Sequence, residues 1–190
     1  MTIAPTQPIL KDCESKGIKE LTEPHLTFIK VGFGYSLMVF IGKGFRTDGA
    51  SIPEWLLYDD VYGTYIQNLL FRRFPKITTL YDIETLFRNL IGEPFDMPRL
   101  LASIVHDALY GIKWKFRWLC DIIYRRTLLQ SNYPHVRADI EYTLIGLFGR
   151  KNWDSVTKDE MEQTKKLVKV EFVRNKKIPK ITEGFQIKYG

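Results

Sequence analysis

The chain has 190 residues, 45% hydrophobic and 26% charged, a balance that is typical of one folded domain and excludes a disordered chain. Its formal charge of +6 favours acidic partners such as nucleic acid, anionic lipid or an acidic protein surface, without identifying one. Two cysteines, Cys13 and Cys120, do not make a disulfide framework, and no apolar stretch approaches the roughly 20 residues that a membrane span needs. The N-terminus also lacks the pattern of a signal peptide, so we expect folding in a reducing cytoplasm.

The N-terminal part predicts an arm followed by a small sheet. Residues 1–24 are broken by three prolines and one glycine and predict a loosely packed arm. From 25 to 45, apolar residues recur with a period of two. This pattern predicts two or three antiparallel strands, with a hairpin near Gly32 and Gly34.

The stretch RTDGASIPEWL, residues 46–56, predicts a loop after these strands. Thr47, Asp48 and Ser51 place hydroxyl and carboxylate oxygens around Gly49. Such a loop either offers oxygen ligands to a hard cation or hydrogen-bonds its own backbone. Both interpretations stay open at this point.

A helical region follows the loop. Residues 58–95 predict two helices that form an insertion, rich in Tyr, Phe and Leu. Asp96 can cap the next helix, with Pro98 in its first turn and Gly111 at its end. A further helix is expected to begin near Phe116.

The C-terminal part predicts two more helices. One is opened by Pro134 and ended by Gly149. The other begins with a capping box of Thr157 and Glu160 and is expected to run to about Arg174. The basic, proline-broken tail after it either pairs as an edge strand or contacts a partner.

These elements predict an α+β fold, with a small N-terminal antiparallel sheet followed by a mainly helical body. The predicted division is an arm over 1–24, a core domain over 25–150 with the insertion at about 58–95, and a C-terminal helix with a basic tail over 151–190.

Four polar residues of the central helix pair carry the chemistry. His106 and Tyr110 are four residues apart and share a helix face, whereas Asp107 points about 100° away. Asp121 on the next helix can fix the imidazole of His106 through one ring nitrogen, as a general base requires. Tyr110 can hydrogen-bond Asp121, and Asp107 can bind a cation such as calcium next to the activated water.

This arrangement resembles the phospholipase A2 signature, in which His-Asp-x-x-Tyr on one helix meets an Asp on the next. The resemblance covers a short part of the chain, and the disulfides and the adjoining Gly-rich calcium loop of that superfamily are missing. It implies that His106, Asp121 and Tyr110 form the catalytic group. Calcium would then be held by Asp107, and the loop at Asp48 is the nearest candidate for further ligands.

A broader resemblance covers most of the chain. GFRTDGASIP, then IVHDALY, a helix with CDIIYRRTL and another that ends in LFG are similar to a phage-associated family catalogued as domain of unknown function 1353. The insertion at 58–95 and the extension at 151–190 depart from its usual pattern. The resemblance implies a viral gene product without supplying an activity. It also implies that the residues that carry the match converge in space: Asp48, Ser51, His106, Asp107, Tyr110 and Asp121.

Two functions follow from these observations. The first is a structural or assembly protein of a tailed-phage virion (tail, baseplate or capsid-connected), made in the host cytoplasm and binding other phage structural proteins. Whether it forms a homo-oligomer stays open, and no specific nucleic-acid motif is present. The alternative is a calcium-assisted His/Asp hydrolase that acts on lipid or another ester of the host envelope. The polar group at His106 correspondingly either fixes the fold or orients a base.

Overall fold

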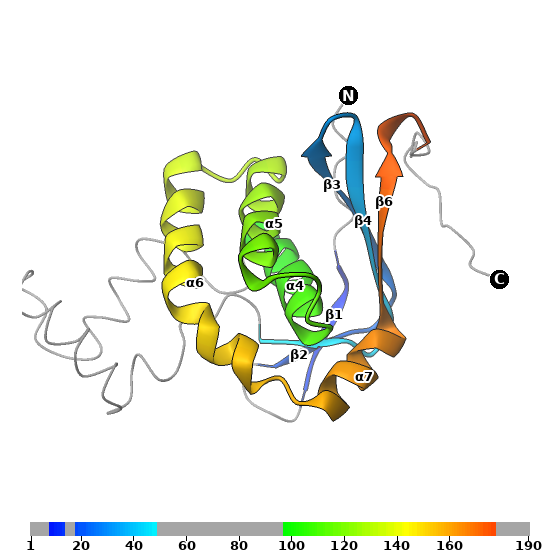
Figure 1. Ribbon diagram of the computed structural model, residues 1–190. Helices are drawn as coiled ribbons and strands as arrows, with labels where there is room; N and C mark the ends of the chain where they lie inside the picture. The colour runs from blue at the N-terminus through cyan, green and yellow to red at the C-terminus, as the bar shows by residue number, and fades with distance from the viewer. Residues whose placement is uncertain (1–7, 14–17, 49–96, 178–190) are drawn as a thin grey trace, which may run out of the picture.

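The computed structural model describes residues 8–13, 18–48 and 97–177. Within these ranges the chain is an α+β protein, as predicted, in which small antiparallel sheets precede a mostly helical body (Figure 1). The predicted insertion at 58–95, the cap at Asp96 and the oxygen-rich residues after Asp48 lie outside the described residues, and so does the tail after 177.

The larger sheet has the strand order β3-β4-β6, with β3 (His25–Gly32), β4 (Tyr35–Ile41) and β6 (Val168–Arg174). Strands β3 and β4 form the predicted hairpin. Its turn uses φ angles of +107° at Gly32 and +76° at Gly34, a region that glycine enters without the steric cost that other residues meet. The prediction of antiparallel strands in this part of the chain is confirmed.

A smaller sheet has the order β1-β2-β5 and consists of very short strands: β1 (Leu10–Asp12), β2 (Lys19–Leu21) and β5 (Arg46–Thr47). Strands β1 and β2 could not be predicted from the sequence, because three residues give too few alternations for a period of two to be recognised. Leu21 is nevertheless fully buried, so this part of the predicted arm packs on the core.

The C-terminal end of the sheet corrects one prediction. The helix that begins at the capping box, α7 (Lys158–Leu167), ends well before Arg174, and β6 continues from it. The capping box itself is confirmed, since Glu160 N donates to Thr157 Oγ1 and Thr157 N donates to Glu160 Oε2, at 3.2 and 2.8 Å. The sequence VKVEFVR alternates apolar and charged residues and is rich in β-branched valine, which favours a strand on the free edge of β4. A short 3-10 helix, η1 (Asn175–Lys177), follows.

Three helices make the body: α4 (Met97–Gly111), α5 (Arg117–Gln130) and α6 (His135–Ser155). The predicted end of α4 at Gly111, the start of α5 after Phe116 and the start of α6 after Pro134 are confirmed. The predicted end of α6 at Gly149 is wrong, because the helix continues to Ser155. The helices α4 and α5 lie between the larger sheet and α6 (Figure 1).

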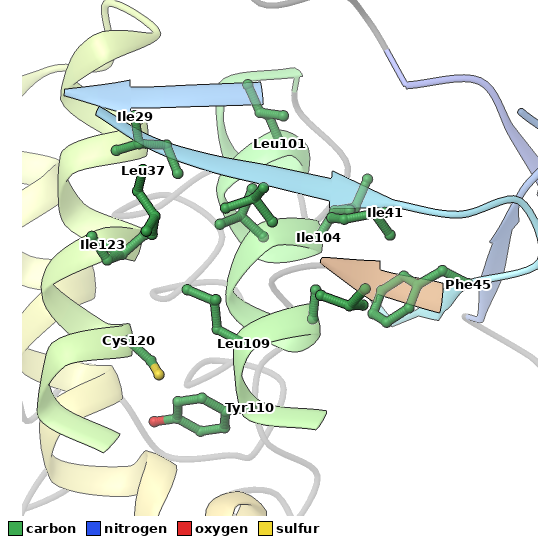
Figure 2. Packing of buried hydrophobic residues seen from close by; sticks show 14 of the residues in the cluster. Ile29, Leu37, Ile41, Phe45, Leu101, Ile104, Leu109, Tyr110, Cys120 and Ile123 are labelled. Atoms are coloured by element: carbon green, nitrogen blue, oxygen red, sulfur yellow. The ribbon is translucent and has the colours of Figure 1, made fainter. Parts of the chain in front are cut away.

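The core fills the space between the sheet and the α4–α5 pair, as Figure 2 shows. It consists of large aliphatic side chains from one face of the sheet and from the facing sides of both helices, among them Ile29, Leu37, Ile41, Leu101, Ile104, Leu109 and Ile123. Each such side chain contributes about 1.5–3 kcal/mol when it is fully buried. Tyr110 lies at the border of this core near Cys120 (Figure 2), and its hydroxyl group reaches the buried side chain of Asp121. In the described ranges, no helix has the length and apolar character to cross a bilayer.

Candidate functional site

The predicted polar group forms around the carboxylate of Asp121. His106 Nε2 lies 3.1 Å from Asp121 Oδ1, and the Tyr110 hydroxyl donates to the same oxygen at 2.6 Å. All three residues are buried, with Asp121 exposed by only 2% and His106 by 8%. The structure therefore brings His106, Tyr110 and Asp121 together, in the arrangement that their spacing predicts.

The local sequence explains this geometry. His106 and Tyr110 are one helical turn apart on α4, and their ring centroids lie 3.9 Å from each other. A short connection leads from Gly111 to α5 and returns the chain antiparallel, with Asp121 on the facing side. The thiol of Cys120 donates to Trp114 O at 3.3 Å and fastens this connection to the helix that follows it.

Arg117 is a fourth member that the sequence analysis missed. Its Nη1 donates to Asp121 Oδ2 at 3.2 Å, so both carboxylate oxygens are hydrogen-bonded. The same guanidinium donates to two backbone carbonyls of α6, at Ile145 and Gly146, over 3.3 and 3.1 Å. The i,i+4 spacing of Arg117 and Asp121 on one helix is the sequence signal that could have found it.

The other ring nitrogen of His106 faces a second carboxylate. His106 Nδ1 lies 3.9 Å from Asp107 Oδ1, which is beyond hydrogen-bond distance. Asp107 Oδ2 accepts a hydrogen bond of 2.5 Å from the hydroxyl of Thr47, the last residue of β5. The side chains of Asp107 and His106 are 29% and 11% exposed, so this side of the site is its more open part.

The surroundings raise the pKa of both His106 and Tyr110, although for different reasons. Burial alone lowers the pKa of His106, but the carboxylates of Asp107 and Asp121 outweigh it, so the pKa lies above its ordinary value of 6.5. Burial, and then the charge of Asp121, raise the pKa of Tyr110 well above 10. Tyr110 is therefore a neutral hydrogen-bond donor at physiological pH, and the imidazole of His106 is a stronger base than that of a free histidine.

A second buried polar cluster, which the sequence analysis also missed, adjoins the first. Arg99 Nε donates to Glu141 Oε2 at 3.2 Å, and the Tyr124 hydroxyl donates to the same oxygen at 2.5 Å. Tyr124 also packs edge-on against the ring of His106, with centroids 5.4 Å apart. The second cluster thus connects α4, α5 and α6 and holds one side of the imidazole.

The predicted metal ligands are only partly brought together. Asp48 follows Thr47 directly and is exposed, whereas Thr47 is hydrogen-bonded to Asp107. Among residues 8–13, 18–48 and 97–177, no group of three or more His, Cys, Asp and Glu side chains could hold a metal ion. Ser51 and Gly49 lie outside the described residues. The described residues alone do not make a calcium site, and the metal-binding roles of Asp48 and Asp107 stay predictions.

No protein-family model matches the chain, and neither a curated protein nor a solved structure matches it. The resemblances to phospholipase A2 and to the phage-associated family stay predictions.

Proposed function

We propose that the core domain is a hydrolase in which His106 is the general base and Asp121 orients it. The observation that carries this proposal is the pairing of Nε2, not Nδ1, with Asp121. A carboxylate that accepts the Nε2–H proton fixes the neutral imidazole in the tautomer whose lone pair is on Nδ1. That lone pair faces the more open side, next to Asp107 and Thr47.

The chemistry that this geometry supports is attack of water on an ester carbonyl. Nδ1 of His106 takes the proton as the water oxygen bonds to the carbonyl carbon and the carbonyl π bond opens to an oxyanion, and Asp121 stabilises the imidazolium that forms. When the carbonyl re-forms, the bond to the alcohol oxygen breaks and the imidazolium gives its proton to the leaving alcohol. Tyr110 and Arg117 hold Asp121 by the hydroxyl and guanidinium contacts described above. The carboxylates of Asp107 and Asp121 raise the pKa of His106, which makes its neutral imidazole a stronger base than that of a free histidine. The substrate class is lipid or another ester of the host envelope, as the resemblance to phospholipase A2 suggests.

The test compares ester hydrolysis by the wild type and by His106→Gln, with a soluble short-chain ester and with phospholipid vesicles. Glutamine can still donate to Asp121 but offers no basic nitrogen, so we expect the rate to fall by about 100-fold or more. His135→Gln is the matched control, because His135 is exposed at the start of α6. Each assay is run with calcium and with a chelator, which tests the predicted cation separately. Equal rates for the wild type and His106→Gln would contradict the proposal.

A second candidate function is favoured by the contacts of Arg117. Asp121 accepts from Tyr110 and Arg117, and Arg117 also binds the backbone of α6, so one carboxylate joins three helices. Such a network fixes a fold without catalysis. In that case the chain is a structural or assembly protein of a tailed-phage virion that is made in the host cytoplasm and binds other phage structural proteins.

The two candidates differ in the response of stability to His106→Gln. A fold-fixing network predicts no hydrolysis by the wild type and a marked loss of stability in the variant. A catalytic base predicts hydrolysis that the variant loses while its thermal unfolding stays close to that of the wild type. Co-sedimentation of the purified protein with phage particles tests the assembly function directly.

A further inference from the structure

The two edge strands of the larger sheet, β3 and β6, differ in whether their outer backbone groups are hydrogen-bonded to a helix. The edge of β3 is closed by α5: Gln130 Nε2 donates to Phe28 O at 2.6 Å, and Gln130 Oε1 accepts from Lys30 N at 3.0 Å. Arg126 Nη1 donates to Lys30 O at 3.0 Å. The amide of Gln130 thus takes the place of a neighbouring strand, which protects this edge from pairing with another chain.

The contacts at Gln130 also show which backbone groups of β6 point outward. The backbone groups of Phe28 and Lys30 point away from β4. In an antiparallel pair, two residues directly opposite each other point their backbone N–H and C=O groups either both toward the partner strand or both away from it. Met38 is the partner of Phe28, so its backbone groups point away from β3 and toward β6. The backbone groups of Glu171, the partner of Met38 on β6, therefore point toward β4. It follows that Lys169, Glu171 and Val173 use their backbone groups within the sheet. Val168, Val170 and Phe172 turn theirs to the outer edge.

In the described part of the chain, β6 is paired on one side only, with β4. Figure 1 shows this strand at the border of the molecule. Phe172 is 58% exposed although it is apolar. Lys169 and Glu171 are exposed charges on the other face of the strand, and neither forms a salt bridge among the described residues. A seven-residue strand with an exposed aromatic residue is the kind of edge that associates with another strand.

We propose that β6 pairs antiparallel with β6 of a second copy of this chain, with the two-fold axis at Val170. In this register the outward groups of Val170 bond to those of Val170 in the second copy, and Val168 bonds to Phe172 of the second copy. Lys169 then stands opposite Glu171 of the second copy, and the two-fold axis repeats this pair. The strand is therefore complementary to itself in charge, and Phe172 is covered by Val168 of the second copy.

Other registers fit less well. A two-fold axis at Glu171 would let Val170 bond to Phe172 of the second copy, but it would place the Glu171 carboxylates of the two copies directly opposite each other. An axis at Phe172 would place Glu171 opposite Val173 and leave both charges without a partner. The register centred on Val170 satisfies the backbone and the charges together.

The test is sedimentation equilibrium of the full chain over a range of concentrations, where we expect a dimer. Lys169→Glu alone and Glu171→Lys alone each place like charges opposite one another, and we expect each to raise the dimer dissociation constant by about tenfold or more. Mixing the two single variants restores opposite charges across the axis, so the mixture dimerises again. Lys158→Glu, the same charge change at the exposed start of α7, is the matched control and leaves the constant unchanged.

A further variant separates edge pairing from other modes of association. Val170→Pro removes an outward N–H and no bond to β4, so it blocks the edge, and a proline at an edge position is compatible with a strand. Circular dichroism confirms that each variant is folded. A wild type that stays monomeric at the highest concentration would overturn the proposal. A dimer that survives Val170→Pro, or single charge variants that do not recover on mixing, would overturn it equally.

Discussion

Gly149 of α6 lies directly against the hydroxyl of Tyr110: a Cβ atom at this glycine would come within 2.7 Å of Tyr110 Oη. That separation is well below ordinary van der Waals contact, so α6 reaches the site only because residue 149 has no side chain. The same hydroxyl donates to Asp121. The close approach of α6 therefore restricts the position of the Tyr110 hydroxyl, which in turn holds Asp121 next to His106.

Gly149→Ala should destabilise the protein even though alanine is the better helix former. The new methyl group forces either α6 or the Tyr110 hydroxyl to move, and we expect a loss of about 1–3 kcal/mol in the free energy of unfolding. Urea denaturation measures it. Gly146→Ala is the matched control on the same helix, because its Cβ would meet nothing within 4 Å. There we expect a gain of up to about 1 kcal/mol.

The double variant Gly149→Ala with Tyr110→Phe tests the cause. Phenylalanine removes the oxygen that the methyl group would meet, so the cost of Gly149→Ala should be clearly smaller in this background. An equal cost in both backgrounds would show that Gly149 is required for some other contact.

The same glycine shows why part of the fold could not be predicted. A glycine after an apolar helical pattern indicates a helix end or a close approach equally well, and only the position of Tyr110 decides between them. The boundary at Leu167 is similar: helical spacing and strand alternation overlap there, and the free edge of β4 determines that the chain continues as a strand. Hairpin turns and the capping box depend on neighbours in sequence, and both were predicted correctly.

The residues of the site also fall into those that could be predicted from local sequence and those that could not. His106 and Tyr110 share a helix, and a short connection brings Asp121 to them, so their meeting was predictable from spacing. Arg99 and Glu141 are far apart in sequence, and only the packing of α6 against α5 brings them together. Nothing local in the sequence marks such a pair.

Glu141→Gln should be strongly destabilising, because it leaves the buried guanidinium of Arg99 without the counter-charge of Glu141. The two side chains are 1% and 3% exposed, and breaking a buried pair costs about 3–5 kcal/mol. Asp139→Asn is the control, since the pair that Asp139 forms with Arg125 is 55% and 34% exposed and is worth less than about 1 kcal/mol. Chemical denaturation compares the two. Similar losses in both variants would contradict the assignment of Arg99 and Glu141 as a buried pair.

The two cysteines should differ in reactivity. Burial, and then the charge of Asp121, raise the pKa of the Cys120 thiol to about 12, and the thiolate is the reactive form. Cys13 is only half-buried. We expect a thiol reagent at pH 8 to modify Cys13 in the folded protein and Cys120 only after unfolding. Cys13→Ser serves as the control, and rapid labelling of the folded Cys13→Ser variant would contradict the buried position of Cys120.

His25 should make stability fall in mild acid. Its side chain is 3% exposed, its Nε2 has no hydrogen-bond partner among the residues that the structure describes, and burial lowers its pKa to about 4. The unfolded chain takes up the proton near the ordinary value of 6.5, so between pH 6.5 and 4 the unfolded state binds more protons than the folded state. His25 therefore contributes about 3 kcal/mol to the free energy of unfolding. This contribution is complete above pH 6.5 and is lost as the pH falls toward 4. His106, whose pKa is raised, contributes with the opposite sign: its part is present in acid and is lost as the pH rises through its folded pKa.

Because the two histidines oppose each other, the wild-type profile alone does not isolate His25, and a variant that cannot titrate does. His25→Leu removes the proton uptake and keeps an apolar side chain at the buried position. Free energies of unfolding from pH 8 to pH 4 should therefore fall less steeply for His25→Leu than for the wild type, with the difference confined to the interval below about pH 6.5. Parallel curves for His25→Leu and the wild type would mean that the folded protein admits the proton at His25 without cost.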